Sequence, residues 1–286
     1  RVQVAADPSF AAPVVDVVVA DSSHDVSSLT QDETYFWRVA AINACGEGTF
    51  SAQRSFTASA ELVYLVVDDA DASLQAYFTN TLDAIGVAYR SHPVGATPTG
   101  IEMLSHPVVI WTCGNLGSID AAETTEVEAY LDAGGRFMLS AQDYLWPYRP
   151  DVPPFGQDVL GIASVDNDGG DYTLVSGVAG SPLAAVGSLT LDYPFSDWSD
   201  AITAGGPGTL ALVGNNGRGA AVTTDTTVFL AFPFEAVANN GTDTTSADAQ
   251  ALLAAILGHL TSTLEPPMFA DGFESGDTSA WPVVNP

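Results

Sequence analysis

Six short apolar runs, separated by stretches with helical periodicity, dominate the sequence from residue 61 to about residue 264. The runs are Leu62–Val67, Val87–Arg90, Val108–Thr112, Arg136–Ser140, Leu210–Val213 and Val228–Phe232. Near-continuous apolar strands that alternate with amphipathic helices are typical of a parallel sheet covered by helices on both faces. The sequence therefore predicts an α/β domain with a mostly parallel sheet.

Three of the segments between the runs have the apolar stripe of a surface helix. The first stripe consists of Leu74, Tyr77, Phe78, Leu82 and Ile85. Gly86 ends this helix, because glycine tolerates the left-handed conformation at a helix terminus. A second helix begins at Asp120 with Glu123 three residues later, which is typical of a capping box. Thr245 and Asp248 predict the same start for the last helix.

Residues 1–58 have a different pattern, in which short alternating strands are divided by turns. In the segment 34–43, the side chains of Tyr35, Trp37, Val39 and Ala41 share one face. This alternation buries one side of a sheet. The pattern predicts an all-β sandwich that precedes the α/β domain.

The first domain resembles a fibronectin type III module of bacterial extracellular enzymes. The resemblance rests on Leu29, the polar turn 31–34 and the aromatic-Trp-Arg-Val strand 35–39. Such a module has about seven strands, and the match begins at the third strand. We therefore expect a partial module over residues 1–58. Its missing strands would come from an upstream domain of the same precursor or from another copy of the protein.

A partial module has a consequence for its core. Without the missing strands, the inner faces of Val2, Val4, Trp37 and Val39 would lose packing partners. Each large apolar side chain left uncovered forfeits about 1.5–3 kcal/mol. We therefore expect these four residues to remain uncovered unless another polypeptide segment packs on them.

The second domain, residues 59–264, resembles class I glutamine amidotransferase-like domains, in particular those appended to secreted bacterial peptidases. Four segments occur in the family's order, at 63–71, 108–115, 130–143 and 229–237. The resemblance implies a flavodoxin-like sheet with helices on both faces. Sheets of this kind bind ligands beyond the carboxyl ends of their strands.

The residues that catalyse the amidotransferase reaction are absent. Active members place a Cys nucleophile on a turn after a strand and a His-Pro-Glu segment after a late strand. Here the turn contains Ser140 to Asp143, and the late segment keeps only Glu235. A thiolate needs a neighbouring imidazole, so we expect no amidotransferase activity. A hydrolase that uses Ser140 with Asp143 and Glu235 is an alternative, although no histidine is placed to serve it.

Two acidic loops are candidate calcium sites. The candidate ligands are Asp68, Asp69 and Asp71 in one loop and Asp166, Asp168 and Asp171 in the other. Calcium prefers carboxylate oxygens, but the spacing and distal Glu of an EF-hand are missing. Helix capping and a polar hairpin turn are the alternatives for the two loops. No other cofactor is indicated.

Two further groups of residues allow more than one interpretation. Tyr144, Trp146, Tyr148, Phe155 and Trp198 form an aromatic set that could stack on sugar rings or form a packed loop. The only two cysteines, Cys45 and Cys113, allow one disulfide between the domains. Alternatively, Cys113 is a small buried residue.

The charge and the C-terminal segment bear on location and partners. The net charge is -28, which disfavours binding to nucleic acid or to an anionic membrane surface. No run of about 18 apolar residues occurs, so no membrane span is expected. In the tail, residues 265–286, the segment 272–281 resembles a short motif near the ends of secreted gammaproteobacterial proteins.

These resemblances imply a secreted or cell-surface protein. The first hypothesis is a non-catalytic accessory region of a larger secreted enzyme, a peptidase, that acts in spacing, stabilisation or targeting. The second is a surface or fibre-forming structural protein completed by strands from a neighbouring chain. The third is the Ser140 hydrolase.

Overall fold

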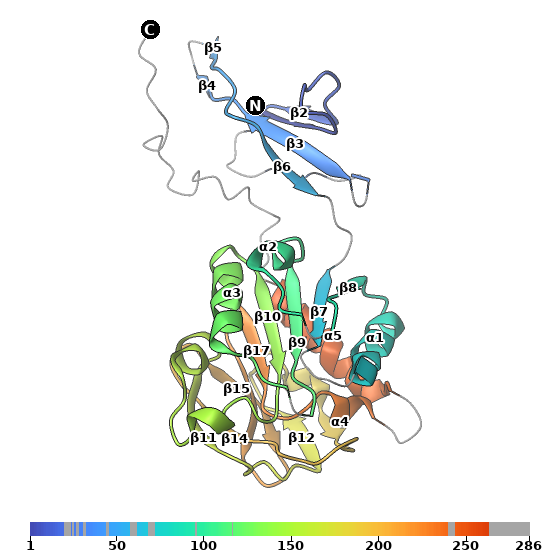
Figure 1. Cartoon of the computed structure of the whole chain (residues 1–286), viewed down its shortest axis with the longest axis vertical. Coiled ribbons are helices and arrows are strands. Elements are labelled where there is room, and N and C mark those ends of the chain that lie inside the picture. The colour runs from blue at the N-terminus through green and yellow to red at the C-terminus, as the bar shows by residue number, and fades with distance from the viewer. Residues whose placement is uncertain are drawn as a thin grey trace. The chain divides into compact units, whose positions relative to one another are not determined.

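The computed structural model describes residues 1–19, 24, 26, 29–30, 33–43, 46–57, 62–67, 72–94, 96–115, 117–239 and 244–262. The chain divides into two compact units between Ala60 and Glu61, and each unit is described by itself (Figure 1). Cys45, Asp68, Asp69, Asp71 and the tail 265–286 lie outside the described residues. The predictions made for them, including the disulfide, stay predictions.

The larger unit is built on one eleven-stranded sheet, whose middle is parallel. In spatial order the parallel strands are β8 (Tyr89–Ser91), β7 (Val63–Val67), β9 (Val108–Thr112), β10 (Arg136–Ser140) and β17 (Thr227–Leu230). Numbered along the chain, this order is 2-1-3-4-5, the flavodoxin-like order. The predicted fold class is confirmed, and β9 and β10 have the predicted bounds.

Beyond β17 the sheet continues with antiparallel strands. These are β16 (Gly219–Thr223), β15 (Thr209–Gly214), β12 (Leu174–Gly177) and β13 (Ser188–Thr190), and β14 (Ala201–Ala204) joins β16 to β11 (Ile162–Asp166). The run Leu210–Val213, which was expected among the parallel strands, lies in β15 and is antiparallel. The physical reason is the short turn 215–218 between β15 and β16, since parallel neighbours need a long crossover.

Helices cover both faces of the parallel strands. One face carries α1 (Gln75–Ala84), α4 (Glu235–Ala238) and α5 (Ala247–Thr261), and the other carries α2 (Gly100–Met103) and α3 (Ala121–Asp132). Short helical turns occur at η1 (Ala72–Leu74), η2 (Trp146–Tyr148), η3 (Phe155–Val159) and η4 (Ala184–Val186).

Two of the predicted helix starts can be compared with the cap geometry. Asp120 caps α3 and forms the predicted capping box with Glu123. The start of α5 differs by one residue, because Ser246 Oγ accepts the hydrogen bond from Ala249 N at 3.0 Å. Thr245 instead accepts a hydrogen bond from the hydroxyl of Thr81 in α1.

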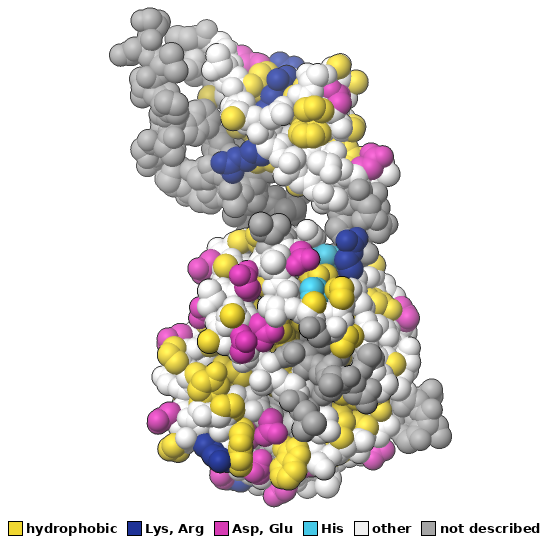
Figure 2. Space-filling view, in the orientation of Figure 1, with side chains coloured by type: hydrophobic (Ala, Val, Ile, Leu, Met, Phe, Trp, Pro, Cys, Tyr) yellow, Lys and Arg dark blue, Asp and Glu magenta, His cyan; other side chains and the backbone are white. Residues whose placement is uncertain are grey.

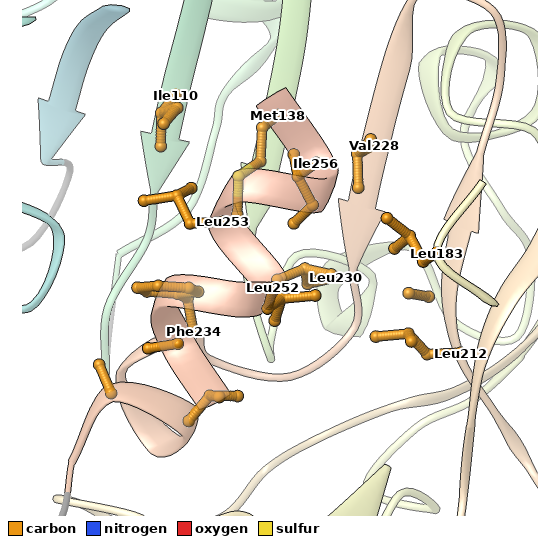
Figure 3. Close-up of a cluster of buried hydrophobic side chains, with 14 of the residues drawn as sticks. Ile110, Met138, Leu183, Leu212, Val228, Leu230, Phe234, Leu252, Leu253 and Ile256 are labelled. Atoms are coloured by element: carbon orange, nitrogen blue, oxygen red, sulfur yellow. The ribbon is translucent and has the colours of Figure 1, made fainter. Parts of the chain in front are cut away.

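Alternate residues of the parallel strands enter two separate hydrophobic cores, as a two-residue period requires. In β7, Val63 and Leu65 enter one core, and Tyr64 and Val66 enter the other. Figure 3 shows the first core, where Leu252, Leu253 and Ile256 of α5 pack on Ile110, Met138, Val228 and Leu230 of the sheet. The parallel part of the sheet is therefore buried on both faces.

The smaller unit contains a four-stranded antiparallel sheet. Its order is β2 (Val15–Val17), β1 (Val2–Ala5), β3 (Thr34–Val39) and β6 (Arg54–Thr57), with a separate hairpin of β4 (Ile42–Asn43) and β5 (Gly46–Glu47). Tyr35, Trp37 and Val39 face the core as predicted. Ala41 is exposed, because β3 ends at Val39.

The expectation of an uncovered core in this unit is wrong for the four residues named above. Val2, Val4, Trp37 and Val39 are each at most 9% exposed. The physical reason is that Val19, Val26 and Leu29, which follow β2 in the chain, pack on this cluster. That an upstream domain or another copy of the protein adds strands to this unit stays a prediction.

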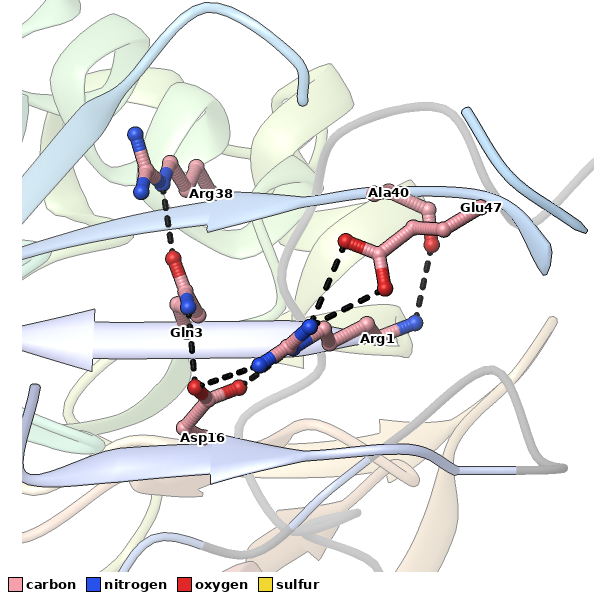
Figure 4. Close-up of polar contacts among 6 residues, drawn as sticks. All are labelled: Arg1, Gln3, Asp16, Arg38, Ala40 and Glu47. Carbon is pink, nitrogen blue, oxygen red and sulfur yellow. Dashed lines mark hydrogen bonds and ion pairs between the residues drawn. The ribbon is translucent and has the colours of Figure 1, made fainter. Parts of the chain in front are cut away.

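The opposite face of this sheet carries a polar network centred on Arg1 (Figure 4). The guanidinium donates to both oxygens of Asp16, at 2.5 and 2.7 Å, and to Glu47 at 3.0 Å. Gln3 Nε2 donates to Asp16 at 3.0 Å, and Gln3 Oε1 accepts from Arg38 at 2.9 Å. The hydrogen bonds from Arg1 and then Gln3 lower the pKa of Asp16 to about 2.

Candidate functional site

Ser140, the predicted nucleophile, is the last residue of β10 and is fully buried. Its Oγ accepts a hydrogen bond of 2.9 Å from the backbone nitrogen of Phe234. Its carbonyl oxygen accepts a second bond, from the backbone nitrogen of Cys113 at 2.9 Å. The hydroxyl therefore joins the segment after β17 to the end of β10.

Glu235, which begins α4, is also fully buried. The hydroxyl of Thr112 at the end of β9 donates a hydrogen bond of 2.8 Å to Glu235 Oε1. The same hydroxyl oxygen accepts a bond from Gly114 N at 3.2 Å. The structure thus brings Ser140 and Glu235 to the same edge of the sheet, as predicted, but uses both to join strand ends.

The turn after β10 is closed by a second loop. The side chain of Gln142 is 1% exposed; its Oε1 accepts from Trp198 N at 3.0 Å and its Nε2 donates to Ser196 O at 3.2 Å. The neighbouring Asp143 is half-buried, and this burial, followed by the negative charge of Asp168, raises the pKa of its carboxyl. Loop 196–198 is therefore joined to the turn that follows β10.

The histidines make their observed contacts elsewhere. His92 Nδ1 forms a hydrogen bond of 2.6 Å with the hydroxyl of Tyr64, and the ring of His106 stacks on Tyr64 with centroids 4.8 Å apart. His259 Nε2 donates to Thr224 O at 2.8 Å. Figure 2 shows histidine side chains beside a basic one at one end of the larger unit. These contacts do not join an imidazole to Ser140.

Asp200, which the sequence reading missed, is the most perturbed acid described near this edge. It is 1% exposed, and its Oδ1 accepts from Asp168 N at 3.1 Å and from Asn167 Nδ2 at 3.4 Å. Its Oδ2 is buried and has no hydrogen-bond partner among the described residues. Burial raises the pKa of Asp200 to about 7, and the charges of Asp143 and Asp168 contribute. No sequence signal separates this acid from its polar surroundings.

The acidic loop that contains Asp166, Asp168 and Asp171 is closed by an arginine. The guanidinium of Arg218 forms an ion pair with Asp166 and donates to Gly169 O at 2.7 Å. Across the described ranges, no three Asp, Glu, His or Cys side chains are placed to hold a metal ion. The structure therefore adds no support for calcium at this loop, and the calcium prediction stays untested.

The predicted aromatic set is divided by the structure. Tyr144 and Phe155 are buried, at 1% and 5% exposure, whereas Trp146, Tyr148 and Trp198 are exposed by 43%, 37% and 44%. A shallow depression of about 550 Å³ lies elsewhere, over β11 and β14, and Asp166 is the only predicted site residue that lines it. That depression is therefore separate from the predicted catalytic groups.

The fold and the site together define a flavodoxin-like α/β domain whose Ser140 and Glu235 are closed off by its own loops. Within the described part of the chain, no helix has the length and apolar character needed to cross a bilayer. No family model and no curated protein matches the sequence.

Several solved structures resemble the chain. A glutamine amidotransferase from Thermotoga maritima is 12% identical, with a TM-score of 0.42 over 76% of this chain and 93% of that one. A second glutamine amidotransferase is 11% identical, with a TM-score of 0.45 over 70% and 98%. A ThuA-like protein from Bacteroides uniformis is 12% identical, with a TM-score of 0.42 over 73% and 95%. Similarity at this level is no guide to activity.

Proposed function

We propose that this chain is a non-catalytic accessory region of a larger secreted bacterial enzyme, a peptidase, and that it acts in spacing, stabilisation or targeting. The observation that supports the non-catalytic part of the proposal is the hydrogen bond from Phe234 N to Ser140 Oγ. A nucleophile must reach its substrate and a base must reach the nucleophile. Here the hydroxyl is buried and already serves as a structural acceptor.

The same observation argues against a hydrolase that uses Ser140, Asp143 and Glu235. Glu235 is fully buried, and its carboxylate accepts a hydrogen bond from the hydroxyl of Thr112. This contact is typical of a carboxylate with a structural role. Ser140 and Glu235 therefore satisfy polar groups at strand ends, which buried polar residues in folded proteins generally do.

Glutaminase and esterase assays on the purified chain test this proposal. We expect no turnover above the buffer rate, and Ser140→Ala should leave that background unchanged. Turnover that disappears in Ser140→Ala would establish the hydrolase and overturn the accessory role. Thr209→Val, at an exposed position of β15, serves as the variant that controls for sample handling.

The smaller unit supports the extracellular part of the proposal through its resemblance to a fibronectin type III module. Its four strands form one antiparallel sheet with an apolar inner face, as expected for one half of a sandwich. In this proposal, an upstream domain of the same precursor supplies the strands that complete the module.

A second candidate function is a surface or fibre-forming structural protein, in which a neighbouring chain supplies those strands. One observation favours it: β2 lies at the edge of the four-stranded sheet, and the flanking Val14 and Val18 are 55% and 67% exposed. Exposed apolar edge strands are templates for pairing with another chain. Sedimentation that shows concentration-dependent association, lost in Val18→Lys, would favour this candidate over the first.

A further inference from the structure

We propose that Trp146, Tyr148 and Trp198 form a carbohydrate-binding face at the carboxyl edge of the parallel sheet. This inference specifies the targeting role, because a carbohydrate would be the target. It rests on the proposed function in one respect: the carboxyl edge of the sheet is taken to bind a ligand without catalysing a reaction. Open α/β sheets bind their ligands at this edge. Trp146 and Tyr148 follow β10 in η2, and Trp198 precedes β14 in the chain.

The two loops that carry these rings are joined by one buried side chain. Gln142 lies directly after β10, and its amide accepts from Trp198 N and donates to Ser196 O. Four residues later, Trp146 begins η2, and its backbone nitrogen donates to Asp143 O at 3.2 Å. Both aromatic loops are therefore anchored to the same turn.

Two of the three rings, those of Tyr148 and Trp146, also have contacts with neighbouring side chains. Tyr144 is buried and lies 6.0 Å from Tyr148 and 6.0 Å from Phe229, measured between ring centroids. The guanidinium of Arg149 lies over one face of the Trp146 ring, 3.1 Å from its centroid, which leaves the opposite face for a ligand. Anchored rings lose little conformational freedom when a ligand stacks on them, which lowers the cost of binding.

The chemistry around the rings fits a neutral sugar. Trp and Tyr combine an apolar ring with a polar tip, which matches the C–H face and the hydroxyl edge of a pyranose. Asp143 and Asp197 are only half-buried in the same two loops, and their carboxylates can accept hydrogen bonds from sugar hydroxyls. The net charge of -28 disfavours an anionic ligand at this face.

Affinity gel electrophoresis tests the proposal on the whole chain, with hydroxyethylcellulose, galactomannan, laminarin and soluble starch as separate probes. We expect at least one of them to retard the protein and to shift its tryptophan emission. Trp198→Ala and the double variant Trp146→Ala/Tyr148→Ala should each weaken that binding by about tenfold or more, that is by at least about 1.4 kcal/mol.

The control variant is Leu104→Ala, which removes a side chain that is 50% exposed and lies after α2. It should bind as the wild type does, and circular dichroism establishes that all variants are folded. Two results overturn the proposal: no retardation by any of the four polysaccharides, or equal retardation of the wild type and Trp198→Ala. Either result leaves the absence of turnover, and with it the accessory role, unaffected.

Discussion

Thr112 and Glu235, which are 123 positions apart in the chain, are joined by a buried hydrogen bond of 2.8 Å from Thr112 Oγ1 to Glu235 Oε1. The bond connects the end of β9 to the first residue of α4, across the intervening β10. The buried carboxylate of Glu235 is thus part of the framework that joins the strand ends.

Thr112→Val tests the contribution of this bond. The valine has a similar shape but no donor, so Glu235 loses a partner and Gly114 N loses its acceptor. We expect the free energy of unfolding to fall by about 1–3 kcal/mol, the cost of leaving buried polar groups unsatisfied. Urea titration of the whole chain, followed by amide exchange in β9, measures it.

The control is Thr209→Val, which makes the same chemical change at an exposed position of β15. It should alter the free energy of unfolding by less than about 0.5 kcal/mol. If the two variants lose equal stability, the hydrogen bond between Thr112 and Glu235 does not have the structural role described here.

The parallel part of the fold could be predicted because its signals are local. Strands buried on both faces read as continuous apolar runs, which gave β9 and β10 their bounds, and the cap at Asp120 lies next to the helix that it begins. The antiparallel extension was missed because strands such as β12 and β13 are only four and three residues long and contain serine, threonine or glycine. Such segments resemble turns in sequence.

The state of the candidate site could not be predicted, because it depends on long-range contacts. The partner of Ser140 is 94 positions away, and the backbone nitrogen of Asp200 is bonded to Ala231 O. A serine or aspartate in a polar loop looks the same in sequence whether it is exposed or buried. The contacts of loop 196–198 with Gln142 likewise join residues more than 50 positions apart, which no local pattern predicts.

Calcium can be tested on the folded chain. A bound ion stabilises the native state by mass action, so millimolar calcium should raise the unfolding midpoint if either acidic loop binds it. Because Asp166 is already paired with Arg218, we expect any rise to persist in Asp166→Asn. Calorimetry of both proteins with and without calcium measures the shift. A rise that vanishes in Asp166→Asn would assign calcium to the loop that Arg218 closes.

Asp16 should make the smaller unit sensitive to acid. Its pKa is lowered to about 2 by the hydrogen bonds from Arg1 and Gln3. Because this pKa is lowered, the ionised carboxylate of Asp16 stabilises the folded state above the usual Asp pKa of about 3.9. This stabilisation is lost as the pH falls towards about 2. Amide protection of β1 and β2 should therefore fall with acid in the wild type. Asp16→Asn should show a weaker dependence, and an unchanged one would contradict the role of the Arg1 network.

Asp200 should have the opposite effect on the larger unit. Its pKa is raised to about 7 by burial, so the folded state holds a proton that the unfolded chain releases above about pH 4. Stability is therefore greatest below about pH 4 and declines as the pH rises towards about 7, by an amount on the order of 4 kcal/mol at most. Asp200→Asn keeps an oxygen that can accept from Asp168 N and cannot ionise.

This variant should match the wild type near pH 4, exceed it in stability near pH 7 and lose most of the pH dependence between them. Urea-dependent amide exchange in β14 and β16, which pair beside Asp200, reports on this unit alone. Asp225→Asn, at an exposed turn between β16 and β17, should retain the wild-type dependence. Parallel pH profiles for the wild type and Asp200→Asn would show that Asp200 is ionised throughout, and that its buried Oδ2 has a partner in solution.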